Sequence, residues 1–224
     1  DSTNQYALDL IKEGIPEGTI VISDRQKKGK GRKKRIWDSP LGGLWFSIII
    51  IPKISPDRSM MITMVASISI VQAINQITGI NAEIKWPNDI LINGKKVCGI
   101  LTELEIEKNS VKYAVIGIGI NVNNDLNKDL KETAISIKEI KNTDISLLEL
   151  FQEILRRFDY HYQDFVNNNF DKIRELWLSY SKIIGKKVEV QDEEKIIQGD
   201  VCDVDNFGNL ILQTSQGKVR INIG

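Results

Sequence analysis

The strongest constraint on the fold is a tight turn at Asn93-Gly94, which stands between two runs of strand-forming residues. Asn-Gly is a preferred pair in two-residue hairpin turns, because both central residues must adopt a positive φ. Residues 82–92 and 97–106 are therefore predicted to form antiparallel strands. A third apolar run at residues 111–118 extends this hairpin to a predicted three-stranded meander.

Helices and further strands are predicted around this meander. A Ser-x-x-Gln capping pattern at Ser2 predicts a first helix that ends at Gly14. Residues 57–78 contain neither Gly nor Pro, which predicts a long, mostly buried helix that ends at Gly79. Residues 147–180 carry apolar side chains at helical spacing. The other predicted elements are strands at residues 19–24 and 44–51 and, between them, a loop rich in Gly and Lys at residues 25–43.

The C-terminal end of the chain has a different pattern. Short alternating strands are predicted at residues 188–190, 196–204, 210–212 and 219–223, with a turn at 206–209. A unit of roughly 40 residues is too small to bury a good core alone, so it is expected to pack on the rest of the chain. The predicted domains are residues 1–182 and residues 183–224.

The balance of charge and the cysteine content limit the class of protein. Lys plus Arg equals Asp plus Glu, 30 each, so no net charge draws the chain to DNA or to a membrane. The apolar run at residues 44–51 is too short to span a bilayer, and no signal peptide opens the chain. Cys98 and Cys202 have no metal or disulfide motif around them. We therefore expect a cytoplasmic protein with no DNA or membrane partner.

The most unusual segment is a basic loop at residues 25–35. Seven of the nine residues 27–35 are Lys or Arg, and the other two are Gly29 and Gly31. Glycines let a backbone expose its N–H groups to an anion, and arginine can bind phosphate oxygens through two hydrogen bonds. The spacing is not that of a P-loop. A nucleotide site is favoured, while a solvated basic loop or a nucleic-acid patch remains an alternative.

A second segment, Lys85-Trp86-Pro87-Asn88-Asp89, predicts a rigid turn. Pro87 fixes its own φ and restricts the preceding residue to extended conformations. An aspartate presented in this way can hold Mg²⁺ together with a nucleotide phosphate. A simple polar turn between strands explains the segment equally well.

Two later features could complete such a site. Lys96 stands at the start of a strand predicted to return past Asp89. Gly117 and Gly119 alternate on a strand and would leave one face bare for a ligand or for another backbone. A surface lysine and tight packing are the ordinary alternatives.

The sequence gives little support to a hydrolase with its own nucleophile. His161 is the single histidine, and it lies on a predicted amphipathic helix. With no second histidine and no activated cysteine motif, neither a Ser-His-Asp nor a Cys-His site is indicated. A reaction in which the substrate's own carboxylate attacks fits better, since it needs cations, a metal and positioning.

Taken together, these segments resemble one family, the biotin–protein ligases. Residues 183–224 resemble the family's small SH3-like barrel. Position 30 departs from the family's Gly-Arg-Gly-Arg loop, because it is a lysine here. The matching features are Asp1-Ser2-Thr3-Asn4, the loop Gln26…Gly29-x-Gly31-Arg32 with Trp37, the Lys85–Asp89 motif, Lys96-x-x-Gly99, and Gly117-x-Gly119-x-Asn121.

The resemblance implies an α+β fold, a mixed β-sheet backed by helices as in class II aminoacyl-tRNA synthetases and biotinyl/lipoyl ligases. It also implies an activity: formation of biotinyl-5′-AMP from biotin and ATP with Mg²⁺, then transfer of biotin to a lysine of a biotin carboxyl carrier protein. A homodimer is a reasonable expectation. Many bacterial relatives carry an N-terminal DNA-binding domain, and none precedes Ser2, so we expect an enzyme without repressor activity.

The resemblance further assigns expected roles to single residues. Catalytic roles fall on Arg32, Lys96 and Asp89, and Asp89 is also the expected Mg²⁺ ligand. The expected nucleotide contacts are Arg32, Trp37, Asn88 and Asn121. The expected biotin contacts are Ser2, Thr3, Asn4, Gln26, Lys30, Gly31, Arg32, Lys96, Gly99, Gly117 and Gly119, with Ser2, Thr3 and Asn4 at the ureido ring and the three last glycines beside the valeryl chain.

Two other functions remain open at this point. A lipoate–protein ligase or octanoyl transferase shares the fold, but its acyl group has no ureido ring to satisfy a Ser-Thr-Asn cluster. An octanoyl transferase would also need a catalytic cysteine, and neither Cys98 nor Cys202 lies in a suitable motif. A nucleic-acid-binding module built on residues 27–35 would instead show affinity that depends strongly on salt.

Overall fold

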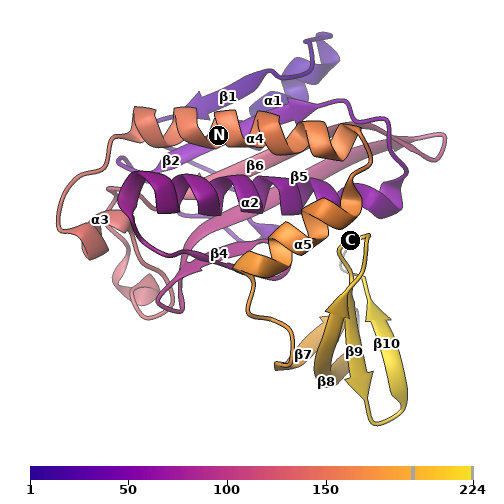
Figure 1. The fold of residues 1–224 in the computed structure, drawn as a ribbon. Coiled ribbons are helices and arrows are strands. Elements are labelled where there is room, and N and C mark those ends of the chain that lie inside the picture. Colours follow the sequence, from indigo (N-terminus) through magenta and orange to yellow (C-terminus); the bar gives the residue numbers. More distant parts are fainter. Residues whose placement is uncertain (193–194, 223–224) are drawn as a thin grey trace.

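The computed structural model describes residues 1–192 and 195–222, and Figure 1 shows their arrangement as two β-sheets with helices. The larger sheet has the order β1-β2-β6-β5-β4-β3, and the smaller one β10-β9-β8-β7. The helices are α1 (Thr3–Lys12), α2 (Ser59–Thr78), α3 (Ile137–Lys141), α4 (Leu147–Val166) and α5 (Phe170–Tyr180), with 3-10 turns at Arg32–Lys34, Pro56–Arg58 and Lys128–Leu130. The strands are β1 (Ile20–Ser23), β2 (Leu44–Ile50), β3 (Glu83–Lys85), β4 (Asp89–Ile92), β5 (Lys95–Glu107), β6 (Ser110–Ile120), β7 (Lys187–Asp192), β8 (Lys195–Val204), β9 (Leu210–Thr214) and β10 (Gly217–Ile221).

The predicted meander forms the middle of the larger sheet. Asn93 and Gly94 both have positive φ, 52° and 78°, and they connect β4 to β5 as a hairpin. The neighbouring strands of this sheet pair antiparallel, while isolated bridges such as Lys96 with Ala134 add parallel pairing. The predicted α+β class, with a sheet backed by helices, is confirmed.

One predicted strand was wrong in its extent. Residues 82–92 were expected to form a single strand, but the structure divides them into β3 and β4, which pair with each other. The chain reverses at Trp86-Pro87-Asn88, where Pro87 has no N–H to donate to a sheet. This reversal brings Asp89 to the start of β4, beside Gly99 of β5.

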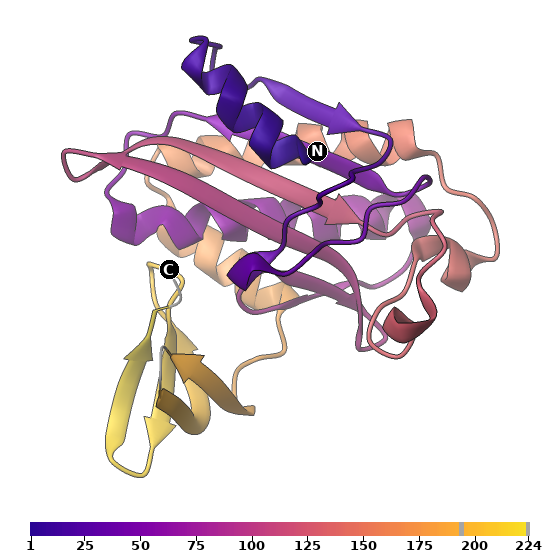
Figure 2. The same cartoon turned by 180° about the vertical axis from the view of Figure 1, so that it is seen from behind.

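Helices cover the two faces of the larger sheet unequally. The helices α2, α4 and α5 pack on one face. There Phe46 of β2 and Phe151 of α4 pack edge to face, with their ring centres 5.1 Å apart. On the other face lie α1 and the basic loop, as Figure 2 shows from behind. Ala7 of α1 packs there against Ile49 and Val115. The second face is therefore only partly covered, which leaves room for a site.

The predicted buried helix is present as α2, preceded by a 3-10 turn. Pro56–Thr78 is long and apolar enough to cross a membrane by length and composition, yet most of it is buried inside the protein. It ends at Gly79, whose φ of 71° is left-handed, as the sequence predicts.

The helical segment predicted at residues 147–180 is two helices. The helix α4 ends at Val166, Asn168 has a φ of 59°, and α5 begins after Asn169. Asparagine tolerates the left-handed conformation better than most residues, which allows the chain to turn here. The short helix α3 was not predicted, although Ser136 and Glu139 form its capping box.

The C-terminal strands form an antiparallel sheet as predicted, with a turn at residues 206–209. In the part of the chain that the structure describes, β7 and β10 are the two edges of this sheet, so the predicted barrel is not seen closed. The last predicted strand ends at Ile221, and residue 223 lies outside the described residues. The sheet packs on the larger unit, where the Arg58 guanidinium lies between the rings of Phe170 and Phe207.

Candidate active site

A cavity of about 1000 Å³ lies on the partly covered face of the larger sheet and extends toward the C-terminal sheet. Its walls come from α1, the basic loop, the turn before β4, and the strands β5 and β6. Every residue for which the sequence predicted a site role lines it: Ser2, Thr3, Asn4, Gln26, Lys30, Gly31, Arg32, Trp37, Asn88, Asp89, Lys96, Gly99, Gly117, Gly119 and Asn121.

One end of the cavity is a buried cluster of polar side chains. Thr3 and Asn4 begin α1, and both side chains reach Ser47 in the middle of β2. The Ser47 hydroxyl is fully buried and lies 2.6 Å from Asn4 Oδ1 and 2.8 Å from Thr3 Oγ1. Asn4 Nδ2 donates to Glu103 Oε2 at 2.7 Å. These contacts fix the orientation of the Asn4 amide.

Gln26 supports this cluster from the loop. Its Oε1 accepts from the backbone N–H of Thr3 at 2.8 Å, and its Nε2 donates to Ser39 Oγ at 2.9 Å. Ser2 Oγ accepts from the backbone N–H of Gln5 and so caps α1 as predicted. The amide of Gln26 therefore positions the start of α1, and its predicted contact with biotin stays a prediction.

The floor of the cavity is a row of glycines across neighbouring strands. Strand register aligns Gly119 of β6, Gly99 of β5 and Asp89 of β4, and two residues earlier Gly117 lies beside Ser47. Residues opposite each other in a ladder, or two apart on one strand, face the same side of the sheet. The polar cluster, the glycine row and Asp89 thus follow one another along a single face.

The space above these glycines is filled by other side chains in this structure. A Cβ at Gly117 would lie 2.1 Å from Asn4 Oδ1, and one at Gly119 would lie 2.3 Å from Trp37 Nε1. A Cβ at Gly99 would likewise lie 2.9 Å from Cζ3 of the Trp37 ring. The predicted role of the glycines, room for a valeryl chain, is untested. The structure shows instead that they admit the close approach of Asn4 and Trp37.

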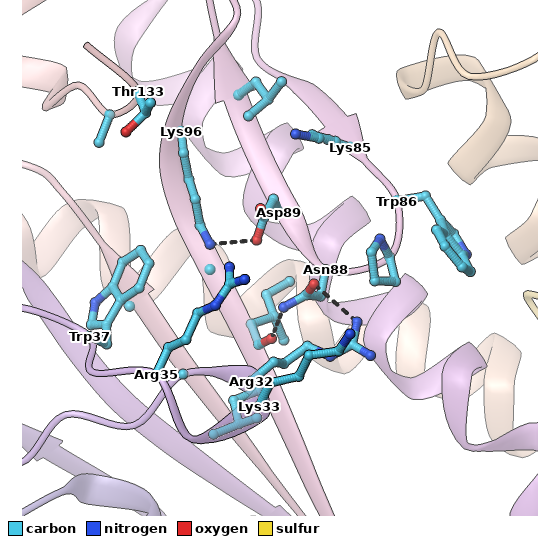
Figure 3. A pocket seen from close by; sticks show the side chains of 18 of the residues that line it. Arg32, Lys33, Arg35, Trp37, Lys85, Trp86, Asn88, Asp89, Lys96 and Thr133 are labelled. Carbon is cyan, nitrogen blue, oxygen red and sulfur yellow. Dashed lines mark hydrogen bonds and ion pairs between the residues drawn. The ribbon is translucent and has the colours of Figure 1, made fainter. Parts of the chain in front are cut away.

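Positive charge gathers at the other end. Lys96 Nζ lies 2.6 Å from Asp89 Oδ1 and 4.9 Å from the centre of the Trp37 ring. Arg32 Nη1 donates to Asn88 Oδ1 at 3.4 Å, while Asn88 Nδ2 donates to the carbonyl of Ile100 at 2.7 Å. Figure 3 shows these side chains converging on one space. Burial lowers the pKa of Arg32, and the nearby charge of Asp89 opposes that shift.

Sequence reasoning missed several lining residues. Arg35 lies in the basic loop but received no role, and Figure 3 shows its side chain directed toward the Lys96–Asp89 pair. Lys85 belongs to the recognised turn and also lines the cavity. Their presence in two already suspected segments was the available signal. The wall formed by residues in the range 126–134 has no signal in the sequence. Hydrogen bonds between the backbone of Lys96 and those of Thr133 and Ile135 bring this segment to the cavity.

The basic loop has a defined conformation around this end. Gly31 N donates to the carbonyl of Arg35, and Trp37 N donates to the carbonyl of Gly29. Between them Lys33 and Lys34 adopt positive φ, 53° and 59°. Left-handed conformations cost a residue with a side chain roughly 1–2 kcal/mol each. The loop tip is therefore a strained segment with few apolar anchors.

Two potentially reactive side chains lie away from this chemistry. Cys98 is fully buried in the core beneath the site, and burial raises the pKa of its thiol, so it is not an available nucleophile. His161 is buried on α4 and contacts Gln72 Oε1 of α2 at 2.9 Å. Neither side chain is therefore placed to react in the cavity.

Comparison with known proteins identifies the family. Residues 1–121 match the biotin/lipoate A/B protein ligase family, and residues 183–224 match the biotin protein ligase C-terminal domain. The bifunctional ligase/repressor BirA of Bacillus subtilis is 39% identical over 98% of this chain, which spans 69% of that relative. A biotin–[acetyl-CoA-carboxylase] ligase of Paracoccus denitrificans is 27% identical, with 97% of this chain and 93% of that protein covered.

A solved structure agrees over nearly the whole chain. Biotin protein ligase from Aquifex aeolicus, in complex with biotin and ATP, is 30% identical and has a TM-score of 0.85, covering 99% of this chain and 91% of that one. The chain therefore belongs to the biotin/lipoate A/B protein ligase family, and within it to the biotin–protein ligases.

Proposed function

We propose that this ligase forms biotinyl-5′-AMP from biotin and ATP in the cavity described above. It then transfers biotin to a lysine of a biotin carboxyl carrier protein. The observation that carries this proposal is the two-ended cavity, with a buried polar cluster at Thr3, Asn4 and Ser47 and a cationic end at Arg32 and Lys96. Biotin has the matching form, since its ureido ring and its carboxylate lie at opposite ends.

The polar cluster suits a ureido ring. A ureido group has two N–H donors and one carbonyl acceptor, and each must find a partner when it is buried. Asn4 and Thr3 supply both kinds of partner, and Ser47 and Gln26 hold them in place. In this proposal Ser2, Thr3 and Asn4 bind the ring, and the valeryl chain takes the space over Gly117, Gly119 and Gly99 that the side chains of Asn4 and Trp37 occupy in this structure.

The cationic end suits the first step. A carboxylate oxygen of biotin attacks the α-phosphorus of ATP, and the bond from that phosphorus to the β-phosphate oxygen breaks, so pyrophosphate leaves. Two anions must approach each other, which costs Coulomb energy unless cations lie between them. Arg32 and Lys96 would supply those charges, with Arg35 nearby. Trp37, Asn88 and Asn121 would contact the nucleotide, and the backbone at Lys30 and Gly31 would close over the adenylate.

The second step is the attack of a lysine amine on the acyl carbon, with AMP as the leaving group. The amine must lose a proton, and Asp89 is the carboxylate next to the proposed reacting atoms. Its ion pair with Lys96 would keep the carboxylate oriented toward the cavity.

Asp89 would also hold the Mg²⁺ that accompanies the nucleotide. Among residues 1–192 and 195–222, no group of three or more His, Cys, Asp or Glu side chains is arranged to hold a metal ion. Mg²⁺ bound to nucleotides usually needs only one or two carboxylates, because phosphate oxygens and water complete its shell. The donor set therefore fits a metal that arrives with ATP rather than a resident one.

Three further predictions complete the proposal. The chain divides into a catalytic unit at residues 1–182 and a C-terminal unit at residues 183–224, which the separate sheets support. It acts in the cytoplasm, which the free thiols of Cys98 and Cys202 suit. It forms a homodimer, which light scattering at micromolar concentration would test.

The nearest alternative is a lipoate ligase or octanoyl transferase. The buried Cys98 thiol and the polar cluster at Thr3 and Asn4 disfavour it. The test is exchange of labelled pyrophosphate into ATP with biotin or with lipoate as the acid. Exchange that depends on biotin supports the proposal, whereas exchange with lipoate and none with biotin would overturn it.

A further inference from the structure

The turn that carries the active-site residues is bonded directly to the C-terminal sheet. Trp86 is almost fully buried, at 8% exposure, and its indole N–H donates to the carbonyl of Gly208 at 3.0 Å. Gly208 lies in the turn between β8 and β9, 122 residues further along the chain. Trp86 stands two and three residues before Asn88 and Asp89, so one hydrogen bond connects the two units next to the site.

The acceptor of this bond is held rigidly. The Asp205 carboxylate accepts from the backbone N–H groups of Phe207 and Asn209 and pairs with Arg220 at 2.7 Å. Gly208 has a φ of 82°, and a Cβ there would lie 2.5 Å from Met60 Cγ of α2. Only glycine allows the turn to lie this close to α2 in this conformation. The Gly208 carbonyl therefore has a fixed position relative to α2.

The residues that follow Trp86 in the sequence line the cationic end of the cavity. The Asn88 carbonyl accepts from Ile100 N at 2.9 Å, and its side chain contacts Arg32. Asp89 pairs with Lys96. A shift of this turn would move Asn88 and Asp89 together, and with them the contacts that orient both cations, while the polar cluster at Thr3, Asn4 and Ser47 belongs to other elements.

We propose that Trp86 is a positioning residue, through which the turn at residues 206–209 of the C-terminal sheet sets the place of Asn88 and Asp89 in the active site. The C-terminal sheet thus contributes to adenylate formation through this turn, in addition to the residues of β7 with which it lines the cavity. This inference rests on the proposed function, because it concerns the step in which biotin attacks ATP.

The test compares Trp86→Phe with the wild type. Phenylalanine keeps most of the buried ring but has no N–H for the Gly208 carbonyl. We expect kcat for adenylate formation to fall by about 10-fold to 10²-fold, the scale expected for misplaced catalytic groups. The Kd for biotin alone, measured by calorimetry without ATP, should stay unchanged. A purely structural role would weaken both, because the whole cavity would loosen.

Asn206→Ala is the matched control. It removes another contact of the same turn, the hydrogen bond from Asn206 Nδ2 to Asp171 Oδ1 at 2.6 Å, but leaves Trp86 intact. We expect it to form adenylate at the wild-type rate. Equal loss in both variants would show general loosening of the interface and overturn the proposal, as would a Trp86→Phe variant with wild-type kcat.

Hydrogen exchange provides a readout that does not depend on activity. In Trp86→Phe, the amides of residues 88–92 should exchange faster, while those of α1 remain as protected as in the wild type. Unchanged exchange at 88–92 would overturn the proposal. If the wild type forms no adenylate but this difference is present, the proposed function fails and the structural coupling stands.

Discussion

Ser47→Ala is the substitution that tests the polar end of the cavity most sharply. The change removes one oxygen from a fully buried site and adds no volume. It leaves Asn4 Oδ1 and Thr3 Oγ1, which lie 2.6 Å and 2.8 Å from that oxygen, without this partner. Asn4 and Thr3 are themselves only 3% and 5% exposed, so water does not replace the lost contact freely.

The magnitude follows from the cost of an unsatisfied buried group. Leaving one such donor or acceptor costs about 1–3 kcal/mol. Part of that cost lowers the free energy of unfolding, and part appears in binding, because the Asn4 amide loses one of the contacts that orient it. A loss of about 1.4 kcal/mol in binding corresponds to a tenfold rise in Kd. We therefore expect the Kd for biotin to rise by about tenfold, as measured by calorimetry.

Ser67→Ala provides the control for stability alone. Ser67 is equally buried, but its hydroxyl donates to the Met64 carbonyl within α2 and lies away from the cavity. This variant should lose stability on thermal unfolding and bind biotin as tightly as the wild type. If Ser47→Ala binds biotin with wild-type affinity, or if both variants lose affinity equally, the polar cluster does not bind the ureido ring.

Three other outcomes are expected. Lys96→Ala should slow adenylate formation by about 10²–10³-fold, the scale for losing one preorganised charge donor, while the calorimetric Kd for biotin stays close to the wild-type value. A proportional loss of both would contradict the assignment. Arg32→Gly should release the adenylate, so that an unrelated bystander protein becomes biotinylated; a variant that makes adenylate but labels bystanders no more than wild type refutes a clamping role. Residues 25–37 should gain hydrogen-exchange protection when biotin and ATP bind, and equal protection in both states would count against ordering of the loop.

The parts of the fold that depend on local signals were predictable from sequence. The Asn93-Gly94 turn, the capped start of α1 at Ser2 and the left-handed end of α2 at Gly79 each have a short-range physical cause, and each is present. The break between α4 and α5 was not predicted. Three consecutive asparagines at residues 167–169 mark the turn, but the apolar spacing on both sides of them is that of one continuous helix.

The site residues likewise divide into those with a local signal in the sequence and those without one. The recognised motifs contained every predicted lining residue, because each motif is continuous in sequence. Ser47 escaped notice since a serine inside an apolar strand has no distinguishing local pattern, and its value comes from α1, 44 residues away in sequence. The position of Trp37 over Gly119 was equally out of reach, because it depends on how the basic loop folds back over β6.

The contact between Trp86 and the C-terminal sheet could not be predicted from the sequence. The sequence identified the turn around Pro87 and, separately, the turn at residues 206–209. Only the packed structure joins them by a hydrogen bond across 122 positions. Long-range contacts of this kind carry no periodicity or composition signal at either end.

The most direct measurement for the central claim is mass spectrometry of an acceptor. The protein is incubated with ATP, Mg²⁺, biotin and a biotin carboxyl carrier domain, with parallel reactions that lack ATP or contain lipoate in place of biotin. The two-ended cavity predicts a mass gain of one biotinyl group on a single acceptor lysine, dependent on ATP. An acceptor that stays unmodified with biotin, or that gains a lipoyl group instead, would contradict the account.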